Sequence, residues 1–170
     1  KAVTNAIENG SMTTLNSYEE LDLAEKLIDL HPGMEMVRFA RTGGEANTIA
    51  IRIARAATGR QKVAVCGYHG WHDWYLATNL ASTNNLDELL LPGLDPTGVP
   101  PELEGTTIAF NYGDIKKLEV ICEECGDELA AVCVEVQRGR DADLEFLLRV
   151  QELAEKVNAV VIFDEISSGF

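Results

Sequence analysis

The chain has 170 residues, of which 46% are apolar and 6% aromatic, and this suffices for one domain with a sizeable core. Its 28 acidic and 14 basic residues give a net charge of −14 spread along the chain, and such a surface repels phosphodiester backbones. No apolar run approaches the roughly 20 residues that a membrane helix needs. We therefore expect a cytoplasmic protein that binds neither nucleic acid nor membranes.

In chain order, the first predicted elements are two helices with a short strand between them. A capping box that begins at Ser17 opens the first helix, which ends at residues 31–33 because proline disfavours helix in the residue before it. Residues 36–40 predict a short strand. A second capping box begins at Thr42 and opens a helix with a narrow apolar face, which ends at Gly59.

After Gly59 the pattern alternates strands with helices. We expect strands at residues 62–66, 106–110, 131–135 and 159–163, and helices at residues 114–125 and 144–157. The alternation predicts an α/β domain with a mainly parallel sheet, helices on both faces and its ligand at the carboxyl ends of the strands. The strand at 159–163 is apolar on both faces, so we expect it at the centre of the sheet. Residues 76–104 lack a clean period and are either an active-site loop or an insertion.

Three features fall at the predicted carboxyl edge of this sheet. The helix start at Thr42–Glu45 contains two glycines, so a ligand can approach its free amides, and the helix dipole favours an anion there. Asp164 directly follows an apolar strand, where a carboxylate holds a cation, bonds to a protonated ring nitrogen, or simply caps a turn. Residues 66–74 are rich in aromatic and imidazole groups, and an aromatic ring there is well placed to stack on a flat ligand. Together these features describe a pocket for a phosphorylated pyridine.

Other interpretations of the same residues stay open. His69, His72 and Asp73 could ligate a metal, although no fourth ligand is evident, or the loop could simply pack. Cys122 and Cys125 have the C-x-x-C spacing of a zinc or redox site, but no second Cys or His pair accompanies them, so we expect ordinary helix residues with reduced thiols. We expect no metal.

Four segments of the sequence resemble, in order, the signatures of the class III pyridoxal-phosphate-dependent aminotransferases. They are MVRFARTGGEAN at 36–47, IRIARAATGR at 51–60, GYHG at 67–70 and IFDEI at 162–166. The string YHGWHDW at 68–74 looks closest to the glutamate-1-semialdehyde aminomutase branch. The resemblance implies a partial large domain of the pyridoxal-phosphate transferase fold type I over residues 1–170. It also implies amino-group transfer on a small amino or oxo substrate, and a homodimer.

The resemblance also implies a pyridoxal 5′-phosphate site and assigns roles within it. Thr42 and the amides after it would bind the phosphate, Tyr68 would stack on the pyridine ring, and Asp164 would pair with the ring nitrogen and keep it protonated. Ser167 would lie near the phenolic oxygen, and Glu135 matches the acidic residue that ends the middle strand. The full set of expected cofactor-binding residues is Thr42, Gly43, Gly44, Tyr68, His69, Glu135, Asp164 and Ser167.

The sequence also departs from the family pattern. Val136 stands where relatives usually have proline, and the loop that follows, residues 137–143, looks shortened, which puts substrate contacts from this loop in doubt. The Schiff-base lysine of the family lies beyond residue 170, as does the small C-terminal domain, so we expect no catalytic residue in this chain and no complete reaction cycle from it alone. The alternatives are a noncatalytic α/β module that binds a phosphorylated metabolite or a partner chain, and a metal-dependent hydrolase that uses the His69, His72 and Asp73 group.

Overall fold

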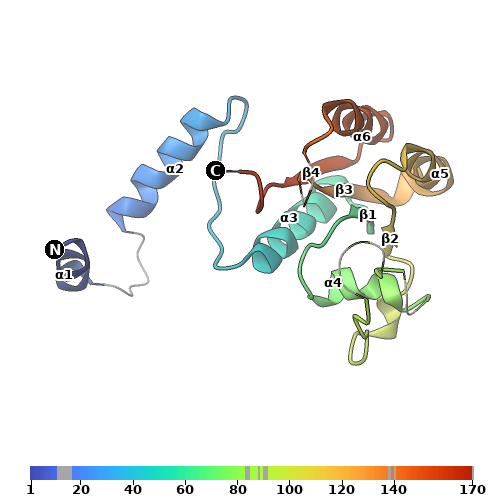
Figure 1. Ribbon diagram of the computed structural model, residues 1–170, viewed down its shortest axis with the longest axis horizontal. Coiled ribbons are helices and arrows are strands. Elements are labelled where there is room, and N and C mark those ends of the chain that lie inside the picture. The colour runs from blue at the N-terminus through green and yellow to red at the C-terminus, as the bar shows by residue number, and fades with distance from the viewer. Residues whose placement is uncertain are drawn as a thin grey trace. The chain divides into compact units, whose positions relative to one another are not determined.

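The computed structural model describes residues 1–10, 17–82, 85–87, 89, 92–137, 139 and 141–169. It divides into two units, residues 1–39 and 40–170 (Figure 1). The first unit holds α1 (Ala2–Asn9) and α2 (Tyr18–Leu30), and neither helix has a buried residue. The expected N-cap of α2 is confirmed, because the Ser17 hydroxyl accepts a hydrogen bond from the Glu20 amide, and His31 is the C-cap after Leu30.

The strand expected at residues 36–40 does not form. These residues have no ladder partner in the described sheet, and Met36 is 86% exposed. An extended segment becomes a strand only when a neighbouring strand satisfies its backbone groups. The helix at Thr42 is therefore preceded by an irregular segment, and the prediction of a strand directly before it was wrong.

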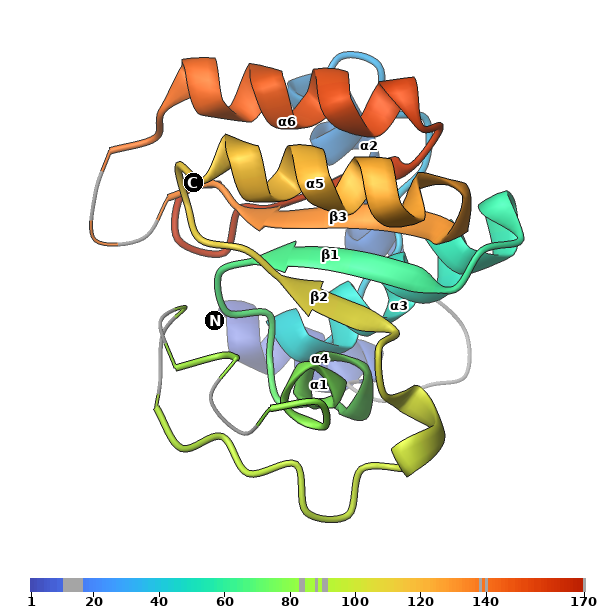
Figure 2. The same ribbon diagram turned by 90° about the vertical axis from the view of Figure 1, so that its right-hand side faces the viewer.

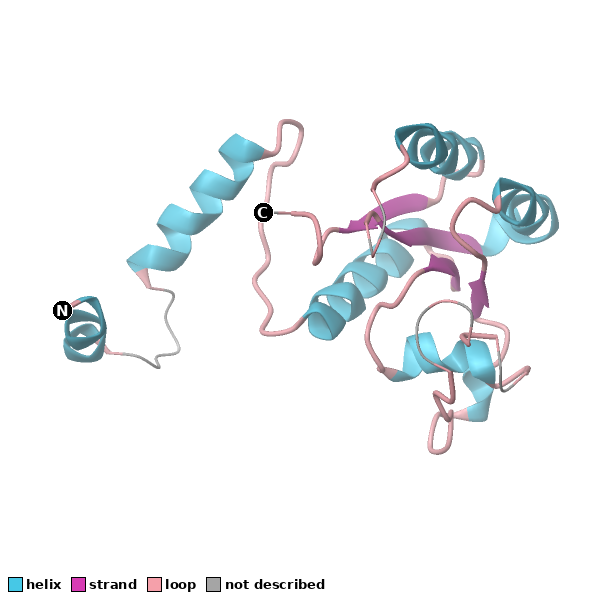
Figure 3. Ribbon diagram, viewed as in Figure 1, coloured by secondary structure: helices cyan, strands magenta, loops and turns pink. Residues whose placement is uncertain are grey.

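The second unit is built on a parallel sheet of four strands in the order β2-β1-β3-β4. The strands are β1 (Lys62–Cys66), β2 (Thr107–Ala109), β3 (Leu129–Glu135) and β4 (Val160–Asp164). The arrowheads of β1, β2 and β3 point the same way in Figure 2, and Figure 3 shows the strands as one layer between helices. The expected α/β fold with a parallel sheet is confirmed, with strand bounds within two residues of those predicted.

Helices cover both faces of the sheet, as the alternation predicts. Side chains alternate along a strand, so Val132 and Val134 of β3 join one core cluster while Ala131 and Cys133 join the other. The first cluster is covered by α5 (Ile115–Cys125) and α6 (Leu144–Lys156). The second is covered by α3 (Gly43–Thr58) and α4 (Asp73–Leu76) (Figure 2). Both C-x-x-C thiols, those of Cys122 and Cys125, are buried against the first cluster.

The strand β4 lies at the edge of the described sheet rather than at its centre. Its residues are half-buried or exposed, with Val160 and Phe163 38% and 40% exposed. An apolar run indicates that both faces of a strand can be covered, but it carries no information about the number of neighbouring strands. The central position predicted for this strand is therefore not what the described residues show.

The segment 76–104 packs as an irregular arm that contains η1 (Ala77–Asn79) and η2 (Pro101–Leu103). The buried Asn79 side chain holds it together, because its amide nitrogen donates to the Leu94 carbonyl and its oxygen accepts from the Leu86 amide. Residues 83, 84, 88, 90 and 91 of this segment lie outside the described residues, as do 138 and 140 of the loop predicted to be shortened. A third short turn, η3 (Gly126–Glu128), precedes β3. In the described parts of the chain, no helix combines the length and the apolar character needed to cross a bilayer.

Candidate functional site

The carboxyl ends of three strands meet at one edge of the sheet. In the parallel register Glu135 at the end of β3 pairs with Asp164 at the end of β4, and Cys66 at the end of β1 pairs with Val134. The start of α3 reaches the same edge, because a Cβ built at Gly43 would lie 4.0 Å from the Ile166 side chain that follows β4. The predicted convergence of the helix start and the strand ends is therefore present.

The first turn of α3 has the geometry of an anion cradle. The Thr42 hydroxyl accepts a hydrogen bond from the Glu45 amide at 3.2 Å, and the Glu45 carboxylate accepts one from the Arg41 amide at 2.9 Å. These hydrogen bonds cap the helix at Thr42 and fix its first residue. The amides of Gly43 and Gly44 lie in the first turn, where a backbone N–H has no acceptor within the helix. Backbone amides and the helix dipole both favour an anion at this point.

The loop after β1 lies directly against this cradle. Gly70 has a φ of +101°, and a Cβ built on it would lie only 2.8 Å from the Cα of Gly44. A Cβ built on Gly44 would in turn lie 3.3 Å from Nε2 of His72. The Thr48 hydroxyl holds that imidazole, since its Oγ1 is 2.9 Å from His72 Nδ1 and 2.8 Å from the Gly44 carbonyl oxygen, to which it donates. Glycine at position 70 allows the loop and the helix to approach this closely, because a side chain there would meet the Gly44 backbone.

Tyr68 stands on the same loop with its backbone fixed by Glu135. The Tyr68 amide donates to Oε2 of the buried Glu135 carboxylate at 3.2 Å. The half-buried Tyr68 ring meets the fully buried Tyr75 ring edge-on, with centroids 5.8 Å apart. The Tyr75 hydroxyl donates to the Gly67 carbonyl at 2.7 Å, which anchors the start of the loop. An aromatic ring held in this way by its neighbours can stack on a planar ligand with little loss of side-chain entropy.

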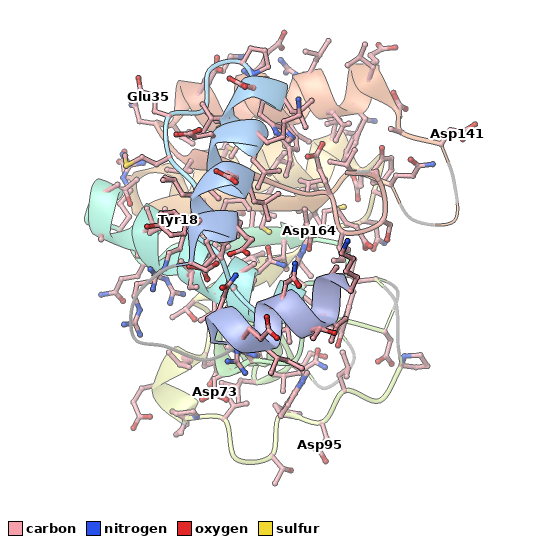
Figure 4. All side chains as sticks on the ribbon, turned by 90° about the vertical axis from the view of Figure 1, so that its left-hand side faces the viewer. Tyr18, Glu35, Asp73, Asp95, Asp141 and Asp164 are labelled. Carbon is pink, nitrogen blue, oxygen red and sulfur yellow. The ribbon has the colours of Figure 1, made fainter. Side chains whose placement is uncertain are left out.

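Asp164, which is labelled in Figure 4, accepts three hydrogen bonds from groups of the described structure. Its Oδ2 accepts hydrogen bonds from Asn47 Nδ2 at 2.8 Å and from His69 Nδ1 at 2.9 Å, and its Oδ1 accepts one from the Ile166 amide at 3.2 Å. Burial by itself raises the pKa of Asp164, but the hydrogen bonds from His69 and Asn47 outweigh it, so that this pKa lies below the ordinary value. The carboxylate is consequently ionised at neutral pH and suited to bind a protonated ring nitrogen.

The remaining predicted residues take different places. His69 is buried, and its Nε2 is 3.1 Å from the Cys66 carbonyl oxygen while its Nδ1 is bonded to Asp164. The ring therefore holds the Asp164 carboxylate in place from the protein interior. Ser167 is exposed in the turn after β4, and it is the neighbouring Ser168 whose hydroxyl is buried without a hydrogen-bond partner in the described structure. His69, His72 and Asp73 do not surround a common point, because among the described residues no three His, Cys, Asp or Glu side chains could hold one metal ion.

Two residues of the candidate site were not predicted from the sequence. Asn47 and Thr48 lie in the second turn of α3, and both connect that helix to loops of the sheet edge. A signal was available for Asn47, since it stands four and seven residues before the buried Ile51 and Ala54 and therefore on the core face of the helix. A polar side chain on that face needs a buried partner.

Comparison with known proteins agrees with this geometry. The sequence profile described as aminotransferase class-III matches residues 1–170. The chain belongs to the class-III aminotransferase family. The profile spans both units, and the family fits a site that offers an anion cradle, an aromatic ring and a partly buried carboxylate at one sheet edge.

Curated relatives within the class-III aminotransferases include both aminotransferases and aminomutases. The 3-aminobutyryl-CoA aminotransferase of Cloacimonas acidaminovorans (strain Evry) is 36% identical over 179 residues, which cover 99% of this chain and 38% of the relative. The glutamate-1-semialdehyde 2,1-aminomutase of Aquifex aeolicus (strain VF5) is 34% identical over 177 residues, which cover 100% of this chain and 40% of the relative. The chain thus spans about two fifths of the length of these relatives.

Solved structures show the same fold. An omega-transaminase from Sphaerobacter thermophilus matches with a TM-score of 0.83 and 30% identity over 98% of this chain and 40% of that chain. A transaminase with PLP bound matches with a TM-score of 0.82 and 28% identity over 98% of this chain and 39% of that chain. The expected fold type I of pyridoxal-phosphate enzymes is confirmed.

Proposed function

We propose that the protein carrying this chain is a pyridoxal 5′-phosphate enzyme that transfers amino groups on small amino or oxo substrates, as an aminotransferase or an aminomutase. The observation that carries the proposal is the Asp164 carboxylate, held by Asn47 and His69 at the same sheet edge as the Gly43–Gly44 helix start. A partly buried, ionised carboxylate and an anion cradle match the basic nitrogen and the phosphate of this cofactor.

Each residue of the proposed site has a separate task. The amides of Gly43 and Gly44 bind the phosphate, with Thr42 fixing the helix start, and Tyr68 packs on the ring. Asp164 holds the proton on the ring nitrogen, and His69 and Glu135 support Asp164 and Tyr68 respectively. We assign Ser167, in the turn after β4, to the neighbourhood of the phenolic oxygen, as the family resemblance implies. When bound, pyridoxal phosphate supplies an electron sink for the substrate carbon that loses a proton.

The proposal includes features of the whole protein. We place the lysine that binds the cofactor, and a small C-terminal domain, beyond residue 170, so that residues 1–170 form part of a large domain. Lys62, which begins β1, does not reach the site, because it lies at the amino end of that strand, where its ammonium is 2.8 Å from the Glu128 carboxylate. We further propose a cytoplasmic homodimer that uses neither nucleic acid nor membranes as a partner.

The experiment is a titration of the purified full-length protein with pyridoxal phosphate. The wild type is expected to develop a visible absorption band that borohydride abolishes, because a lysine–cofactor imine is reducible. Asp164→Ala is expected to lower amino-transfer activity by orders of magnitude, since it leaves the ring nitrogen without its anionic partner.

The matched control is Asp95→Ala, which removes an exposed carboxylate whose hydrogen bonds are to Thr97 in the arm. It is expected to keep both the band and the activity. Absence of the band in the wild type, or full activity in Asp164→Ala, would reject the proposed function.

A further inference from the structure

The buried amide of Asn47 lies between two strands of the sheet edge. Asn47 is 6% exposed, and its Nδ2 donates to Oδ2 of Asp164 at 2.8 Å. On the other side, its Oδ1 is 3.9 Å from Sγ of the fully buried Cys133 on β3. The side chain therefore connects β3 to the carboxylate at the end of β4 through a single amide.

Cys133 and Asp164 together favour one orientation of the Asn47 amide. Burial first, and then the negative charge of Asp164, raise the pKa of Cys133 well above its ordinary value, so the group stays a thiol with a hydrogen to donate. A thiol can donate a hydrogen bond to the amide oxygen, and an anionic carboxylate accepts one from the amide nitrogen. Both neighbours thus favour the one orientation of Asn47 that gives Asp164 a donor.

The bonds to Asp164 leave one of its oxygens for a ligand. Oδ2 accepts from Asn47 on α3 and from His69 on the loop after β1, and two acceptances fill the two lone pairs of that oxygen. Oδ1 accepts from the Ile166 amide only among the described groups, so one lone pair of Oδ1 remains. Donors from two different elements prevent the carboxylate from rotating and exchanging its two oxygens.

We propose that Asn47 is a positioning residue that fixes the Asp164 carboxylate so that Oδ1 meets the protonated ring nitrogen of the cofactor. This inference rests on the proposed function and deepens it, because it names a residue that acts through Asp164. Asparagine is suited to the task, since a leucine of similar size has no donor and an aspartate of the same shape would place a second acceptor 2.8 Å from Oδ2.

The proposal predicts a graded response of the Asp164 titration. The titratable groups around Asp164 are His69, Cys133, its register partner Glu135 and the adjacent Glu165. Asn47→Leu removes a donor to the charged form, so the pKa of Asp164 is expected to rise. Asn47→Asp adds a like charge as well, so the pKa is expected to rise further.

The test uses full-length protein with carbon-13-labelled aspartate carboxyls, first without added cofactor and then with pyridoxal phosphate. In Asn47→Leu the dissociation constant for pyridoxal phosphate is expected to increase by about tenfold or more, the factor that corresponds to one hydrogen bond to a charged group. Asn79→Leu is the matched control, because it also removes a buried asparagine, with bonds to Leu86 and Leu94 in the arm. It is expected to lower the unfolding temperature but to leave the Asp164 titration unchanged.

An Asp164 titration in Asn47→Leu that coincides with the wild type would overturn the inference, whether or not the cofactor binds. Should Asn47→Leu fail to fold, the nearly isosteric Asn47→Asp tests the inference through the same titration, and an unshifted Asp164 pKa in that variant would overturn it equally. A wild type that does not bind pyridoxal phosphate, while the Asn47 variants still shift the Asp164 titration, would instead reject the proposed function and keep Asn47 as the residue that orients Asp164.

Discussion

Gly70→Ala places a methyl group where the loop after β1 touches the start of α3. The new Cβ would lie 2.8 Å from the Gly44 Cα and 3.6 Å from the Gly44 nitrogen, whereas carbon atoms in contact are separated by about 3.5–4.0 Å. Overpacking of this kind costs about 1–3 kcal/mol, and the φ of +101° adds a strain of similar size for a residue with a side chain.

The overlap is relieved when the backbone at Gly44 or the loop at Gly70 moves by roughly 1 Å, since neither contacting atom belongs to a flexible side chain. A shift at Gly44 stretches amide–anion hydrogen bonds beyond their usual range of about 2.7–3.2 Å. The loss of one or two of them weakens binding of pyridoxal phosphate by about 10- to 100-fold. The assay is cofactor titration of the full-length variant by absorbance, with thermal unfolding measured in parallel.

Gly98→Ala separates the clash from the backbone strain. Gly98 has a φ of +92°, and a Cβ built on it would meet nothing within 4 Å. This control is expected to lower stability and to leave the affinity for pyridoxal phosphate at the wild-type level. Equal affinities in Gly70→Ala and Gly98→Ala would refute the cradle geometry derived from the Gly44–Gly70 contact.

Three further outcomes follow from other parts of the structure. Arg60→Met removes the hydrogen bonds from Nη1 to the carbonyls of Leu129, Val157 and Asn158. Chemical denaturation is expected to show that the free energy of unfolding falls by about 1–3 kcal/mol, with unchanged affinity for the cofactor. A changed affinity would contradict a purely structural role of Arg60. Because the pKa of Asp164 is lower in the folded state, its ionised carboxylate stabilises the fold fully above the ordinary aspartate pKa of 3.8. This stability is lost as the pH falls through the lower pKa of the folded state. The free energy of unfolding of Asp164→Asn is therefore expected to depend less on pH in that range. All four cysteines are buried, and burial raises the pKa of the Cys122, Cys125 and Cys133 thiols. A thiol reagent is therefore expected to label the native chain slowly and the urea-unfolded chain at once. Rapid labelling of the native chain would count against the packing of the helices on the sheet.

The sequence predicts much of this fold because local signals and packing agree there. The Thr42 cap, the left-handed Gly59 and the apolar strands near residues 62 and 131 each depend on a few neighbouring residues, and each appears close to its predicted place. Residues 36–40 show the limit, because a strand needs a partner that the local sequence cannot specify. The same limit applies to β4, whose apolar side chains did not reveal its position at the edge.

The site was predictable where a residue sits at the end of an element, and less so where it lies inside one. Asp164 follows directly from its place after an apolar strand, and the glycines follow from their place at a helix start. The contact of Asn47 with Asp164 depends on which strand end lies beside the second turn of α3. Only the order of the strands in the sheet decides that neighbour. No partner of His69 within the protein was predicted from the sequence, and the structure shows its buried ring bonded to Asp164 and to the Cys66 carbonyl.

The most direct measurement is a crystal structure of the full-length protein grown with pyridoxal phosphate. Electron density for the phosphate is expected at the Gly43 and Gly44 amides, with a hydrogen bond between the ring nitrogen and Oδ1 of Asp164. A cofactor bound elsewhere, or a ring nitrogen that faces away from Asp164, would contradict the proposed site.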